Sequence, residues 1–182
     1  MIGFLRFIGV INAAVWLGAA VFLTVWVGPA IFSDDMKDLL TKTNYPYFSG
    51  AIAQIILKRY YHVHLTCGVV AFLHLLAEWL YMGRPARKFS MTLLSALFAL
   101  ALLGGFWLQP KMKDLHAVRY GTRQGVNVTP EEREAARKSF GVWHGVAQLA
   151  NLFMIGGLVV YVWRTANPSD TLRFVSSVKF RG

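Results

Sequence analysis

The sequence is poor in cysteine and in charged residues, and both shortages restrict what the chain can be. Cys67 is the single cysteine among 182 residues, so neither an intrachain disulfide nor a cysteine-based zinc site can form. Charged residues make up 15% of the sequence, whereas soluble domains carry about 25%. The charges lie mainly between long apolar runs. This pattern predicts an integral membrane protein that forms one domain, residues 1–182, without a separate soluble domain.

Familiar catalytic motifs are missing as well. The sequence has no HExxH, no glycine-rich phosphate loop, no Ser/His/Asp set and no paired carboxylates within an apolar run. It also has no CxxCH, which excludes covalent attachment of a c-type haem. We therefore favour a non-enzymatic protein over an enzyme, and quinone chemistry remains an alternative that no motif supports directly.

The net charge of +10 does not indicate nucleic-acid binding. Basic residues flank the apolar runs, where anionic lipid headgroups attract each of them by about 1 kcal/mol, and no recognised nucleic-acid motif is present. The expected partner of this charge is the lipid bilayer.

Four apolar runs predict the fold class: an all-α bundle of four transmembrane helices in up-down order. The runs cover about residues 4–32, 60–82, 89–109 and 141–163, and each has the roughly 20 apolar residues needed to cross a bilayer. Residues 33–59 and 111–138 are expected to be the longer loops, with the second helix extending back as far as Ser49. Thr129, Pro130 and Glu132 form a capping-box pattern that predicts a helix start at Pro130.

The positions of basic residues predict the orientation. We call the side of the N-terminus side A and the opposite side, which carries the two longer loops, side B. Arg84, Arg87 and Lys88 make the short loop on side A basic, and short basic loops stay in the cytoplasm. We therefore expect both termini to be cytoplasmic, in a bacterial inner membrane or its equivalent.

The second apolar run holds an unusual number of polar residues. At 100° per residue, one helical stripe contains His64, Cys67, Ala71, His74 and Glu78. This stripe should face the bundle interior, because polar atoms that face lipid have no partners. His62 points about 200° away from His64 by the same helical geometry. His74 and Glu78, four residues apart, are able to hydrogen-bond each other.

The other runs add fewer polar residues. The fourth run carries His144, Gln148 and Asn151 on one stripe, and the first carries Asn12. These residues can have purely structural roles. The amides would then be interhelical hydrogen-bond partners, Cys67 a small packed side chain and the histidines interfacial residues. In the functional interpretation, the histidines are ligands of one cofactor.

That cofactor would be a b-type haem held between the second and fourth helices. Diagonal helices of a bundle lie roughly 12–14 Å apart, a distance that suits a haem between two axial imidazoles. His144 is one candidate ligand, and either His62 or His64 is the other. A pair of axial histidines would favour electron transfer.

Four segments together resemble the transmembrane protein 205 family and its bacterial relatives, small four-span membrane proteins of uncharacterised function. The segments are VWLGAAVFLTVWVGPAIF, RYYHVHLTCG, FWLQP and FGVWHGVAQLANL. The positions that match the family's pattern are His62, Cys67, Trp107, Pro110, His144, Gly145 and Asn151. His64 does not match, since the resemblance places a small residue there. The resemblance therefore favours His62 as the partner of His144, whereas the helical stripe favours His64, and both remain candidates.

Two functional classes follow. The first is an accessory or structural subunit of a larger membrane complex, which binds other membrane subunits or a second copy of itself. The alternative is a transporter or channel for a metal ion or small molecule, with the stripe from His64 to Glu78 along its path. The sequence shows no pair of broken helices in matching positions, so this alternative would need an oligomer.

Overall fold

Every regular element that the structure describes is helical. The structure is a computed structural model, and it describes residues 2–82, 88–121, 125 and 127–167. The elements in chain order are α1 (Ile2–Phe22), the π-helix η1 (Leu23–Val27), α2 (Gly28–Ile31), α3 (Asp34–Met82), α4 (Lys88–Leu103), the π-helix η2 (Gly104–Leu108), α5 (Gln109–Arg119) and α6 (Pro130–Ala166).

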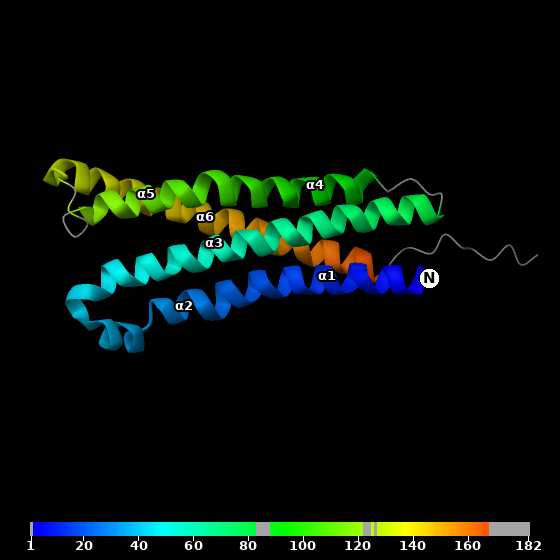
Figure 1. The fold of residues 1–182 in the computed structure, drawn as a ribbon, viewed down its shortest axis with the longest axis horizontal. Coiled ribbons are helices and arrows are strands. Elements are labelled where there is room, and N and C mark those ends of the chain that lie inside the picture. Colours follow the sequence, from blue (N-terminus) through cyan, green and yellow to red (C-terminus); the bar gives the residue numbers. More distant parts are fainter. Residues whose placement is uncertain (1, 83–87, 122–124, 126, 168–182) are drawn as a thin grey trace, which may run out of the picture.

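These elements form four long rods whose directions alternate along the chain (Figure 1). Rod one consists of α1, η1 and α2, and rod three consists of α4, η2 and α5; α3 and α6 are the other two. In the described part of the chain, all four rods are long and apolar enough to cross a membrane. Both α1 and α4 pack against α3 and α6, so α1 and α4 lie on one diagonal of the bundle.

Two segments that the apolar pattern predicted as loops are largely helical. α3 already begins at Asp34, and Ser33 caps it by accepting a 3.2 Å hydrogen bond from the backbone N–H of Met36. α5 continues to Arg119. Hydropathy identifies the part of a helix that contacts lipid, whereas helical structure extends past it wherever caps and local propensity allow. The extended N-terminal part of α3 is kinked at Thr41, which has a φ of 63°.

The predicted start of α6 is confirmed. Thr129 accepts a hydrogen bond of 3.2 Å from the backbone N–H of Glu132, and the Glu132 carboxylate accepts one of 2.9 Å from the Thr129 N–H. Pro130 takes the first helical position, where its missing N–H leaves no intrahelical bond unmade.

Rods one and three contain matching distortions, which corrects the prediction that no such pair exists. A proline removes a backbone donor, and its ring crowds the carbonyl four residues earlier. Pro29 follows η1 and Pro110 follows η2, so each rod accommodates its proline with a π-helical turn and then continues. Trp26 and Trp107 stand three residues before these prolines. The two rods run in the same direction, so both distortions lie toward side B (Figure 1).

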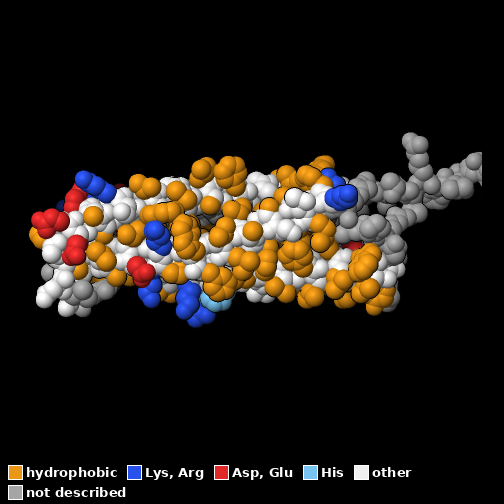
Figure 2. Space-filling model, turned by 90° about the horizontal axis from the view of Figure 1, so that it is seen from above, with side chains coloured by type: hydrophobic (Ala, Val, Ile, Leu, Met, Phe, Trp, Pro, Cys, Tyr) orange, Lys and Arg blue, Asp and Glu red, His pale blue; other side chains and the backbone are white. Residues whose placement is uncertain are grey.

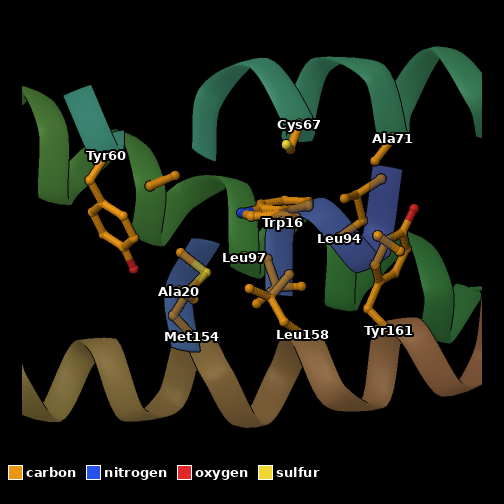
Figure 3. Packing of buried hydrophobic residues seen from close by; sticks show 12 residues of the cluster. Trp16, Ala20, Tyr60, Cys67, Ala71, Leu94, Leu97, Met154, Leu158 and Tyr161 are labelled. Atoms are coloured by element: carbon orange, nitrogen blue, oxygen red, sulfur yellow. The ribbon is translucent and has the colours of Figure 1, made fainter. Parts of the chain in front are cut away.

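The core surrounds Trp16, which is 0% exposed. Figure 3 shows its ring between α3 and α6, close to Cys67, Leu97 and Leu158. Small residues in the same cluster, such as Ala13 of α1, let the backbones approach closely. Outside this core, large apolar side chains are exposed along all four rods, and most charged side chains on the face in Figure 2 lie over the side B half.

Candidate functional site

The polar stripe of α3 is directed inward, as its spacing predicts. His64, Cys67 and His74 are buried. His74 Nε2 lies 3.0 Å from the Leu5 carbonyl oxygen of α1, but 3.9 Å from Glu78 Oε1. The two side chains thus lie near each other, but the imidazole makes its shorter contact to α1 instead of along its own helix.

The amides connect helices. Asn12 donates a 2.9 Å hydrogen bond to the Cys67 carbonyl. Asn151 accepts a 2.7 Å hydrogen bond from the Tyr60 hydroxyl and donates one of 2.7 Å to the Thr24 hydroxyl. This network links α3, α6 and η1, and it satisfies the polar groups that the apolar bundle would otherwise leave without partners.

The three candidate haem ligands do not meet. His64 is 0% exposed, its Nδ1 accepts a 2.7 Å hydrogen bond from Trp16 Nε1, and its ring packs 4.0 Å from that of Tyr60. His62 is exposed, and its Nδ1 lies 2.6 Å from the Lys58 carbonyl on the same helix. His144 lines a cavity whose wall includes neither of the other two.

This arrangement does not fit a haem held between α3 and α6. Both axial ligands of such a haem must present an imidazole nitrogen to one space. Trp16 and the Lys58 carbonyl contact only the Nδ1 atoms of His64 and His62, and His64 Nε2 has no partner within the described residues. Neither of these two histidines, however, lines the cavity that His144 lines. Haem binding stays a prediction, and a Soret band in the spectrum of the purified protein is its readout.

The cavity beside His144 is the principal candidate site. Its volume is about 400 Å³, which lies within the range of small-molecule sites. It lies among η1, α2, α3, α5 and α6, toward side B, and both distorted rods contribute to its wall. Its polar wall residues are Thr24, Gln54, Tyr60, Tyr61, Gln109, His116, Arg119, Tyr120, His144, Gln148 and Asn151.

His116 is a wall residue that sequence reasoning missed. It is 6% exposed, and its Nε2 has no hydrogen-bond partner within the described residues. The ring packs directly over Gly50, where an added Cβ would collide with Nε2. Phe140 lies between His116 and His144, with ring centroids 6.5 and 6.0 Å away.

One signal in the sequence was available for His116. Leu108, Met112 and His116 follow one another at intervals of four, and all three are buried. This helical spacing continues past Pro110 and beyond the predicted span of residues 89–109. A proline in the first turn after a π-helical segment does not end the rod, so the stripe continues to His116.

The cavity wall combines apolar side chains with several polar groups. Gln148 Nε2 lies 3.2 Å from His144 Nε2, and Gln109 Nε2 lies 3.5 Å from Gln54 Oε1. His116 adds an uncommitted ring nitrogen. Such a wall can enclose an apolar molecule and orient a polar group on it by hydrogen bonds.

Four apolar rods with an apolar outer surface are typical of helical membrane proteins. The family model for a domain of unknown function, DUF4149, matches residues 11–121, more than half of the chain, so the chain belongs to this family. The matched segment runs from rod one to the end of rod three, including both π-helices, Gly50 and His116. No curated protein and no solved structure matches the chain.

Proposed function

We propose that this protein is a four-span integral membrane protein that binds a small amphipathic molecule in the cavity between His116 and His144. The four rods would cross the bilayer in up-down order, with both termini in the cytoplasm, so that the cavity lies toward the opposite side. The observation that carries this proposal is the cavity of about 400 Å³ with its apolar wall and its buried, uncommitted imidazole.

The two π-helices support binding at this place. Thr24 and Gly28 bring rod one to the cavity wall, and Leu108 and Gln109 bring rod three. π-helical turns are rare and frequently occur at functional sites, because they cost hydrogen-bond regularity that a fold keeps only where a local shape is needed. Here residues of both π-helices line one cavity.

We propose that the protein binds this amphipathic molecule as a component of a membrane complex. The wall offers neutral hydrogen-bonding groups and one cation, and its residues include no Asp, Glu, Ser or Cys among those that the structure describes. We propose an accessory subunit that associates with other membrane subunits or with a second copy, and we retain the likeness to the transmembrane protein 205 family as part of the proposal.

Transport of a small molecule by an oligomer is the second candidate. The observation that favours it is the pair of π-helical interruptions at corresponding places in rods one and three, since interrupted helices in matching positions commonly flank transporter sites. Flux of the bound molecule in proteoliposomes distinguishes transport from binding alone.

Filling the cavity should abolish binding. We expect a monoacylglycerol that carries a diazirine in its chain to label the wild-type protein on α3, α5 and α6 after irradiation. Gly50→Leu should lower this labelling by at least about tenfold, equivalent to about 1.4 kcal/mol of binding free energy, because the new side chain meets His116 and enters the cavity. Mass spectrometry of the labelled peptides measures the change.

Two further variants make the result specific. Ala53→Phe fills the cavity from another position on its wall and should have the same effect. Gly145→Leu adds an equal volume where no heavy atom lies within 4 Å and should leave labelling unchanged. Wild-type labelling in Gly50→Leu and Ala53→Phe proteins that retain their helical circular dichroism would refute the proposed site.

A further inference from the structure

Arg119 stands where the apolar cavity meets a second, more open one. The outer cavity has a volume of about 550 Å³ and is lined by Pro46, Arg119, Tyr120, Pro130, Arg133, Glu134 and Arg137. Pro46, Arg119 and Tyr120 also line the inner cavity. The two spaces therefore share one boundary, with an apolar wall on its inner side and three arginines and one glutamate on its outer side.

The guanidinium of Arg119 contacts aromatic rings. Its guanidinium lies over the rings of Tyr120 and Phe140, 5.1 and 6.0 Å from their centroids, and within the described residues no carboxylate pairs with it. Arg137 differs, because Glu134 accepts two hydrogen bonds from it at 2.8 and 2.9 Å. Contact with aromatic faces leaves the in-plane N–H donors of a guanidinium available to an anion.

The position of Arg119 is fixed from two directions. It is the last residue of α5, where the negative end of the helix dipole favours a cation, and its guanidinium lies against the rings of Tyr120 and Phe140. The donors of this arginine are thus pre-organised at the mouth of an apolar space. An arginine in that state is suited to bidentate recognition of a phosphate group.

We propose that the molecule bound by this protein is an anionic amphiphile with a phosphate headgroup and a single apolar chain. The phosphate contacts Arg119 at the boundary of the two cavities, and the chain occupies the inner cavity between His116 and His144. The excess of arginine over glutamate around the outer cavity attracts the headgroup. This inference rests on the proposed function, since it names the class of molecule that the cavity holds.

Three probes separate the headgroup from the chain. Lysophosphatidic acid carries both, a monoacylglycerol of the same chain length lacks the phosphate, and inorganic phosphate lacks the chain. Binding to the delipidated full-length protein is measured by native mass spectrometry. We expect lysophosphatidic acid to bind at least about tenfold more tightly than the monoacylglycerol, and inorganic phosphate neither to bind nor to displace it.

Variants assign the preference to Arg119. Arg119→Gln should weaken lysophosphatidic acid to the level of the monoacylglycerol and leave the monoacylglycerol unchanged. Arg119→Lys should retain part of the preference, because the charge stays while the planar fork is lost. Lys113→Gln removes an exposed cation from the same helix, outside both cavity walls, and should change neither affinity.

The outcomes also separate this inference from the proposed function. Equal binding of the two amphiphiles to the wild type, or an undiminished preference in folded Arg119→Gln protein, would overturn the anionic ligand while the cavity remains a binding site. Competition by inorganic phosphate alone would overturn it too, since the chain would then be unnecessary. Failure of both amphiphiles to bind would remove the proposed function itself.

Discussion

Replacing Trp16 with alanine is expected to lower the free energy of unfolding by about 3–5 kcal/mol, the usual cost of truncating a fully buried tryptophan. Trp16 is 0% exposed, and its ring contacts α3 and α6 at the centre of the bundle (Figure 3). The truncation leaves a cavity that three helices cannot close without moving. Unfolding by sodium dodecyl sulfate in mixed micelles, followed by circular dichroism, measures the loss.

A second variant separates packing from hydrogen bonding at Trp16. Trp16→Phe keeps a large ring but removes the donor to His64 Nδ1, a bond of 2.7 Å. Interhelical hydrogen bonds in membrane proteins contribute about 0.6 kcal/mol on average, so Trp16→Phe should cost much less than Trp16→Ala. Trp26→Ala, at a residue that is 67% exposed, should cost little in micelles. A loss below about 1 kcal/mol for Trp16→Ala would contradict this account of the core.

The parts of the fold that depend on local sequence could be predicted. The apolar runs identified four long helices, and the Thr129 capping box placed the start of α6 at Pro130. The helical parts at residues 34–48 and 111–119 were missed, because hydropathy reports contact with lipid and carries no signal for helical turns outside the apolar runs. The π-helix before Pro110 could not be predicted either, since its five residues look like any apolar run.

The candidate site was only partly predictable for a different reason. Helical periodicity determines which residues of one helix share a face, and it correctly placed His64, Cys67 and His74 on the buried face of α3. Periodicity does not determine which neighbouring face a side chain meets, because the rotation of each helix is set by packing with the others. His64 therefore contacts Trp16, whereas His144 lies near His116 of α5.

Close packing at Gly68 gives the second large effect. Gly68 is buried on α3, where an added Cβ would collide with the Phe98 ring of α4 and lie 3.4 Å from Trp16 Cη2 of α1. We expect Gly68→Leu to lower the free energy of unfolding by at least about 1–3 kcal/mol, the usual cost of overpacking a core. The same detergent titration measures this change.

The matched control for Gly68 lies on α1. Gly18 is exposed and has no heavy atom within 4 Å of an added Cβ, so Gly18→Leu introduces the same side chain without a collision. Since leucine favours a helix over glycine by somewhat under about 1 kcal/mol, Gly18→Leu should leave the stability unchanged or raise it slightly. Equal stabilities for the two variants would mean that α1, α3 and α4 do not approach one another at Gly68.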